Sequence, residues 1–258
     1  MSVSLHGERL RLVSILKVAS GIRIQSAIRG RCDQSRVDAA EPIQHFRRAP
    51  SHHRDPLLYP TRNPIGWTDA TWNPWAGCTK LGLECQRCYA LIEANMKAAN
   101  PKTPWYQGTV DVNAAGVMKW AGVINQASDA MWSMPLREKR PSLIFTCSMS
   151  DFFHTNAHDE WRLRAFDIMR TTAGRHIYQI LTKRPEEAEA FLDRNPSFVW
   201  PANAWMGVSV GVRAAYGRIE ILRRLPAAVK FLSVEPLLEP MPDLPLDGID
   251  WVIVGGES

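Results

Sequence analysis

Short apolar runs alternate with helix-like segments through the C-terminal two thirds of the chain, and this alternation limits the fold more than any other feature. Each run is rich in β-branched or aromatic residues and ends in polar residues or glycine, as is typical of strands buried on both faces. The runs are 143–148, 177–182, 205–210, 229–234 and 251–256. A repeat of strand, helix and strand predicts a parallel sheet.

Three segments between these runs have the features of helices. Acidic residues follow His158 in the first, and Pro185 opens the second at the position where proline is best tolerated. The third aligns Ile219, Leu222 and Leu225 on one face. Repeated βαβ units either close into a barrel or open into a doubly wound sheet. We expect an α/β fold, a partial (β/α)6 TIM-type barrel that is truncated after its sixth strand.

The chain divides near residue 64. Residues 1–64 hold 11 Lys or Arg and 5 Asp or Glu, a net charge of +6, whereas residues 65–258 hold 20 and 21, a net charge of −1. We interpret 1–64 as a basic extension that is disordered or arises from an upstream start; a nucleic-acid-binding arm and a transit peptide are the alternatives. We expect residues 65–258 to form one domain that is C-terminally incomplete, because the sequence ends where a sixth strand is expected to lead into a helix.

No segment of the sequence predicts a membrane span or an export signal. The stretch 12–22 is apolar, but it is interrupted by Lys17 and is shorter than the ~20 residues that a membrane helix needs. The cysteine pattern does not suggest an oxidising compartment. We therefore expect a cytoplasmic protein.

Three cysteines, Cys78, Cys85 and Cys88, lie close together, with no fourth cysteine or histidine nearby. A structural zinc site normally has four protein ligands, and a disulfide would leave one thiol over. Three thiolates can hold a 4Fe–4S cluster by three of its irons and leave the fourth iron open. We favour the cluster over zinc or a disulfide. Cys147, in a predicted strand, is interpreted as a packing residue, and Cys32 has no assigned role.

Long motifs lie around the cysteines and at the ends of the predicted strands. They are 67–74, 148–154, 181–185, 207–210, 233–238 and 254–258. Together with the cysteines, these motifs resemble a phage-associated three-cysteine-motif family of uncharacterised proteins that is related to the radical S-adenosylmethionine enzymes. The resemblance covers about three quarters of the chain.

The resemblance implies that S-adenosylmethionine binds the open iron and is cleaved reductively to a 5′-deoxyadenosyl radical. It suggests a nucleic-acid or nucleotide-like substrate. Two features depart from the wider radical family: six residues separate Cys78 from Cys85, where that family usually has three, and Arg87 stands where it favours an aromatic residue. The alternative function is a binding protein stabilised by zinc or an iron–sulfur cluster, without catalysis.

The resemblance also implies candidate cofactor-binding residues at the carboxyl ends of the strands, where parallel barrels build their sites. Asp151 suits an ammonium group. Lys183 and Arg184 suit the cofactor carboxylate or a substrate phosphate, and Glu235 suits the ribose or adenine. The full set is Ser148, Ser150, Asp151, Lys183, Arg184, Ser209, Glu235, Gly255 and Gly256. For these residues, caps, loop hydrogen bonds and plain turns are the alternatives. The sequence indicates neither a catalytic residue nor an oligomeric state.

Overall fold

The computed structural model describes residues 65–255 and the backbone of 13–18 and 21–26. Its centre is a sheet in which six parallel strands lie side by side in chain order. They are β3 Ala70–Trp72, β8 Ser142–Thr146, β9 His176–Thr182, β10 Ala204–Ser209, β11 Lys230–Val234 and β12 Trp251–Val254. The alternation of strands and helices predicted from the sequence is therefore confirmed.

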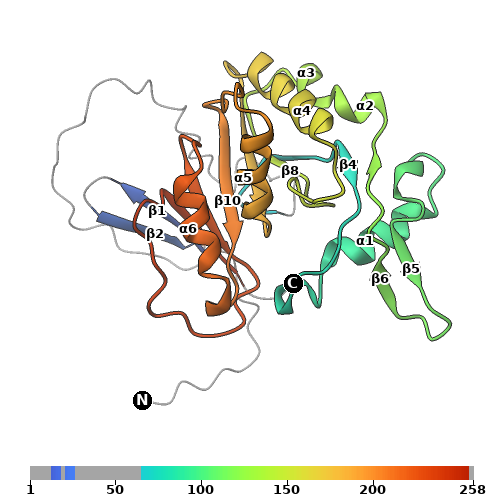
Figure 1. Cartoon of the computed structure of the whole chain (residues 1–258), viewed down its shortest axis with the longest axis horizontal. Coiled ribbons are helices and arrows are strands. Elements are labelled where there is room, and N and C mark those ends of the chain that lie inside the picture. The colour runs from blue at the N-terminus through green and yellow to red at the C-terminus, as the bar shows by residue number, and fades with distance from the viewer. Residues whose placement is uncertain (1–12, 19–20, 27–64, 256–258) are drawn as a thin grey trace.

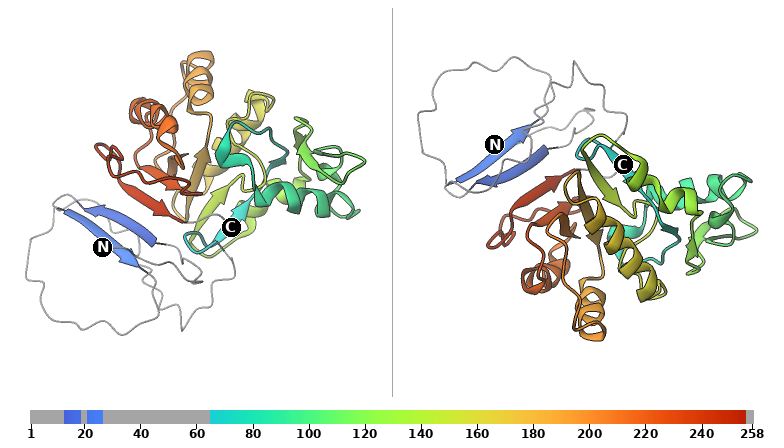
Figure 2. Two further views of the ribbon diagram at one scale, coloured as in Figure 1. Left: turned by 90° about the horizontal axis from the view of Figure 1, so that it is seen from below. Right: turned by 90° about the horizontal axis from the view of Figure 1, so that it is seen from above.

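Three helices connect successive strands from β8 to β11. They are α4 Asp159–Thr171, α5 Pro185–Arg194 and α6 Gly217–Arg224, the last preceded by the short turn η3 Arg213–Ala215. Figure 2 shows them together on one side of the strands. A doubly wound sheet would reverse its strand order at a switch point, whereas these six strands run in one direction across the sheet. The described strands form one open sheet in a mixed α/β fold, and they do not close into a barrel.

Each face of the sheet has its own apolar core, because side chains alternate between faces along a strand. The helix-covered face carries Ile144, Ile180 and Leu232, which pack with α4, α5 and α6 residues in the main core. The opposite face, here called the inner face, packs mainly aromatic side chains. The aromatic residues are Trp67, Phe145, Phe231 and Trp251, and Ile253 packs with them.

A lobe is inserted between β3 and β8, and the sequence did not predict it. Its elements are β4 Trp75–Ala76, η1 Leu83–Cys85, α1 Tyr89–Ala98, η2 Pro104–Tyr106, β5 Val110–Val112, β6 Met118–Trp120, β7 Asn125–Gln126, α2 Asp129–Trp132 and α3 Met134–Arg137. Figure 1 shows α1, β5 and β6 projecting to one side of the sheet. Ala90, Leu91, Tyr106 and Trp120 form a small separate core there.

Two strands from the N-terminal segment extend the other edge of the sheet. β1 Val13–Val18 pairs antiparallel with β12, and β2 Gly21–Ser26 pairs antiparallel with β1. The sequence did not predict them, and the rest of 1–64 lies outside the described residues. None of the described helices is long and apolar enough to cross a membrane.

Candidate functional site at the carboxyl edge of the sheet

The cysteine segment follows β3 and leads through η1 into α1, beside the carboxyl ends of the parallel strands. Cys78, Cys85 and Cys88 are partly buried and form no disulfide. Cys78 and Cys88 both pack against the small core of the lobe. Within the described residues, the predicted cofactor residues lie at the carboxyl end of β10 or in the loops after β8, β9, β11 and β12, and the topology brings these positions to the same edge of the sheet.

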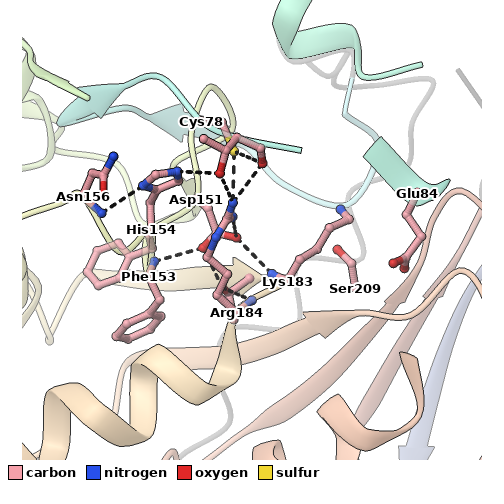
Figure 3. Close-up of polar contacts among 12 residues, drawn as sticks. Cys78, Glu84, Asp151, Phe153, His154, Asn156, Lys183, Arg184 and Ser209 are labelled. Atoms are coloured by element: carbon pink, nitrogen blue, oxygen red, sulfur yellow. Dashed lines mark hydrogen bonds and ion pairs between the residues drawn. The ribbon is translucent and has the colours of Figure 1, made fainter. Parts of the chain in front are cut away.

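The Asp151 carboxylate, in the loop after β8, accepts four hydrogen bonds. Its Oδ1 accepts from the Thr182 hydroxyl at 2.6 Å and from the Phe153 backbone N–H at 3.0 Å. Its Oδ2 accepts from the Lys183 backbone N–H and from Arg184 Nη1, both at 3.0 Å (Figure 3). Because a carboxylate offers about four acceptor positions, none is left for a ligand. Asp151 joins the loops after β8 and β9, and its assignment to a cofactor ammonium does not fit this geometry.

Arg184 joins the same network to the cysteine segment. Its Nη2 donates to the Thr79 carbonyl at 2.8 Å and to the Thr79 hydroxyl at 2.7 Å, while Nη1 lies 3.9 Å from Cys78 Sγ. Burial and the Asp151 charge raise the pKa of the Cys78 thiol to about 12, and Arg184 acts in the opposite direction. Both terminal nitrogens of the Arg184 guanidinium are engaged by protein groups, so Arg184 ties Asp151 to the cysteine segment. Its assignment to a cofactor carboxylate or a substrate phosphate does not fit this geometry.

His154 completes this network as a neutral ring. Its Nδ1 accepts from the Asn156 backbone N–H at 3.1 Å, so Nε2 carries the proton toward the Thr79 hydroxyl, 3.0 Å away. Burial and the charge of Arg184 lower the pKa of His154 to about 4. The ring therefore supports Thr79 at neutral pH without carrying charge.

We expect Asp151→Ala to lower the free energy of unfolding by about 3–5 kcal/mol, because it strands a buried arginine. The side chains of Asp151 and Arg184 are only 7% and 8% exposed. The matched control is Asp167→Ala, whose partner Arg170 is partly exposed; its effect should stay below about 1 kcal/mol. Urea unfolding of the wild type, Asp151→Ala and Asp167→Ala measures the change in unfolding free energy for each variant. Equal midpoints for the two variants would contradict the structural role of Asp151.

Ser148 and Ser150 are engaged in holding loops together. The Ser148 hydroxyl exchanges hydrogen bonds with the Asn73 side chain at 3.0 and 3.2 Å, and the Ser148 carbonyl accepts from the Tyr89 hydroxyl at 3.0 Å. The Ser150 hydroxyl donates to the Trp75 carbonyl at 3.3 Å. Ser148 thus connects the loop after β8 to Asn73, just beyond β3, and to α1, and Ser150 connects the loop to β4.

A row of polar side chains lies on the inner face at the strand ends. Ser209 is directly paired in register with Ser233, and Lys183 follows Thr182, the partner of Val208, so it lies beside Ser209. The Ser233 hydroxyl donates to Glu235 Oε2 at 3.4 Å. Figure 3 shows the Lys183 side chain extending away from Asp151 toward the side where Ser209 lies. Within residues 65–255, the Lys183 ammonium makes no hydrogen bond or ion pair.

Glu235 directly follows β11, Gly255 directly follows β12, and the two residues lie next to each other. A Cβ at Gly255 would lie 2.1 Å from Glu235 Oε1, so the absence of a side chain there makes room for the carboxylate. Burial raises the pKa of Glu235, while hydrogen bonds from Ser233 and Trp67 and the Lys183 charge oppose the shift. Gly256 lies outside the described residues.

Sequence reasoning missed Glu84, a buried carboxylate next to Cys85. It accepts from the Gly211 backbone N–H at 2.7 Å and from Arg218 Nη1 at 2.8 Å. The only sequence signal was its position between two cysteines, because its partners lie more than 100 residues away.

The cysteine segment fits an iron–sulfur cluster in its donor chemistry. It supplies three free thiols and shields two of them with apolar side chains. Among the described residues, however, no three His, Cys, Asp or Glu side chains are gathered closely enough to hold a metal ion. Binding a cluster would therefore require the thiols to turn toward a common point.

These features define an α/β protein with a thiol-bearing segment at the carboxyl edge of an open parallel sheet. Residues 62–258 match the family model described as "Protein of unknown function (DUF5131)", and the chain belongs to this family. No curated protein matches the chain significantly, and neither does any solved structure.

Proposed function

We propose that this protein is an iron–sulfur enzyme of the radical S-adenosylmethionine type, related to the phage-associated three-cysteine-motif proteins. The observation that carries the proposal is the placement of Cys78, Cys85 and Cys88 on one segment tied to the carboxyl edge of a parallel sheet. Three thiolates are the ligand number that leaves one iron of a 4Fe–4S cluster open. Ligands of parallel α/β folds bind at this edge.

The topology supports a partial TIM-type barrel for this domain. Six parallel strands follow one another in chain order, their helices lie on one face, and aromatic side chains fill the inner face. A barrel differs from this sheet in the closure of its edges. If the sheet closes into a barrel, its inner face lines the lumen. The polar row that contains Lys183, Ser209 and Glu235 would then face this lumen.

We assign the cofactor contacts to the groups that remain available at the strand ends. Lys183 provides an ammonium for the carboxylate of S-adenosylmethionine, and Glu235 provides a carboxylate for its amino group or ribose. Ser209 provides a hydroxyl beside them. A bound, reduced cluster would supply the electron that cleaves S-adenosylmethionine. We keep Asp151 and Arg184 out of this set because protein groups occupy both.

The enzyme would act in the cytoplasm, where thiols stay reduced. A nucleic-acid or nucleotide-like substrate is the class we propose. Trp72 and Trp75, near the cysteine segment, do not support this substrate class, because both are fully buried in the main core. They pack there and are not available for stacking on a base.

The alternative function is a binding protein that keeps a zinc ion or an iron–sulfur cluster for stability. One observation favours it: apolar side chains of the cysteine segment and α1 are exposed, with Leu83 59% and Met96 63% accessible. Exposed apolar patches of this kind occur at protein interaction sites.

Anaerobic purification followed by iron, sulfide and zinc analysis tests the proposal. We expect about four irons and four sulfides per chain, as a 4Fe–4S cluster requires. Stoichiometric zinc without sulfide would instead support the binding protein. Metal-free protein after anaerobic reconstitution with iron and sulfide would contradict both.

A further inference from the structure

The stretch between the first two cysteines is fixed at both of its ends. Its first residue, Thr79, is held by two hydrogen bonds from Arg184. Its last residue, Glu84, carries a side chain that is only 2% exposed. The residues between these two anchors include the exposed Leu81 and Leu83. The six-residue stretch between Cys78 and Cys85 is therefore held in place, because both cysteines lie next to its fixed ends.

Glu84 connects this stretch to two further elements of the sheet. Its Oε1 accepts from the Gly211 backbone N–H, just beyond β10, and its Oε2 accepts from Arg218, in the first turn of α6. The same Arg218 Nη1 also donates to the Ser209 carbonyl at 2.7 Å. Both carboxylate oxygens and the guanidinium are thus engaged, and the ion pair is largely buried, with Arg218 15% exposed.

Gly211 is required for the close approach of these groups. A Cβ at this position would lie 2.1 Å from the Pro236 carbonyl oxygen and 3.1 Å from Glu84 Cγ. Backbone cannot move aside as the end of a flexible side chain can. Glycine therefore allows the loop after β10, the loop after β11 and Glu84 to meet at one point.

Each cysteine lies next to a residue that is tied to the sheet. Thr79 follows Cys78 and is bound by Arg184, and Tyr89 follows Cys88 and donates to the Ser148 carbonyl. Glu84 precedes Cys85 in the same way. Of the three ties, the one at Glu84 is itself a buried ion pair. Its partner Arg218 lies on α6, whereas Arg184 precedes α5 and Ser148 lies in the loop after β8.

We propose that Glu84, Gly211 and Arg218 form a positioning latch that fixes Cys85 relative to the strand ends. The inference rests on the proposed cluster for its purpose, since the latch would place the second thiol where a cluster needs it. Its physical content does not depend on metal. If Arg218 is removed, Glu84 loses a charged hydrogen bond in a buried site, and the Cys85 end of the segment opens more often.

Site-specific alkylation of the metal-free protein with iodoacetamide tests the latch. Peptide mass spectrometry gives the rates for Cys78, Cys85, Cys88 and the buried Cys147 in the same sample. In Arg218→Met we expect Cys85 to react at least about tenfold faster, as the loss of one charged hydrogen bond implies. Glu84→Gln should act in the same direction. Arg218→Lys should restore slow alkylation in part, because a lysine can still donate to Glu84.

Arg224→Met is the matched control, because Arg224 lies on the same helix but is 58% exposed in its pair with Glu189. Its Cys85 rate should equal that of the wild type. Unchanged Cys85 rates in both latch variants would overturn the inference. So would equal acceleration of Cys147, since that would report opening of the whole fold.

Iron and sulfide content after anaerobic reconstitution separates this inference from the proposed function. We expect Arg218→Met to hold less iron than the wild type, and Arg224→Met to hold as much. A wild-type protein that takes up no iron would defeat the proposed function, while the alkylation rates would still decide the latch. A wild type and an Arg218→Met variant with equal iron would overturn the latch as a cluster-positioning device.

Discussion

Replacing any one of Cys78, Cys85 and Cys88 by alanine is expected to remove most of the iron and sulfide that the anaerobically reconstituted protein binds. A 4Fe–4S cluster held by three protein thiolates has no spare ligand, so the loss of one leaves two anchored irons. Iron and sulfide per chain, together with the visible absorption of the reconstituted protein, measure the loss.

Cys147→Ala is the matched control for these variants. Cys147 is 2% exposed and packs in the main core, and burial raises the pKa of its thiol. This substitution should leave the iron content unchanged. Full iron content in any of the three loop variants would contradict the ligand set. Loss of iron in Cys147→Ala, with the fold intact by circular dichroism, would make Cys147 a ligand.

The parallel sheet could be predicted because its strands are continuous apolar runs. The runs 143–148, 177–182 and 229–234 correspond closely to β8, β9 and β11. Both faces of these strands are buried, so the signal does not depend on alternation. The helix starts at residues near His158 and at Pro185 were visible for the same kind of reason, because capping chemistry is local.

The inserted lobe could not be predicted, because its elements are too short to show a period. β4 and β7 contain two residues each, and β5 and β6 contain three. Such strands are stabilised by contacts with α1 and by the small apolar core around Tyr106 and Trp120. These contacts are tertiary, and no pattern along the chain encodes them.

The candidate site also has one part that could be predicted from the sequence and another that could not. The common position of Lys183, Ser209 and Glu235 could be predicted, because parallel strands bring their carboxyl ends to one edge. Whether a polar side chain there is free or occupied depends on partners distant in the sequence. Asp151 and Arg184 are 33 residues apart, and Glu84 and Arg218 are 134 apart. The sequence therefore suggested Asp151 as a ligand for a cofactor, whereas the structure shows it saturated by protein donors.

Reduced, reconstituted protein is expected to release 5′-deoxyadenosine and methionine from S-adenosylmethionine, slowly and without any substrate. Dithionite supplies the electron, and a hydrogen atom taken from solvent components or protein completes the product. Lys183→Met and Glu235→Gln should each raise the S-adenosylmethionine concentration needed for half-maximal release by at least about tenfold, as the loss of one charge-assisted hydrogen bond implies. Chromatographic quantification of 5′-deoxyadenosine at several cofactor concentrations measures this.

The iron content of both variants should equal that of the wild type, because neither residue is a proposed cluster ligand. Lys119→Met is the matched control, since Lys119 is an exposed lysine of the lobe whose side chain is 73% accessible; its concentration dependence should be unchanged. If the variants release product at wild-type concentrations, Lys183 and Glu235 do not bind the cofactor. If the wild type carries a reduced cluster and yields no 5′-deoxyadenosine, the radical mechanism is wrong, and the exposed apolar side chains of the cysteine segment and α1 then favour the binding protein.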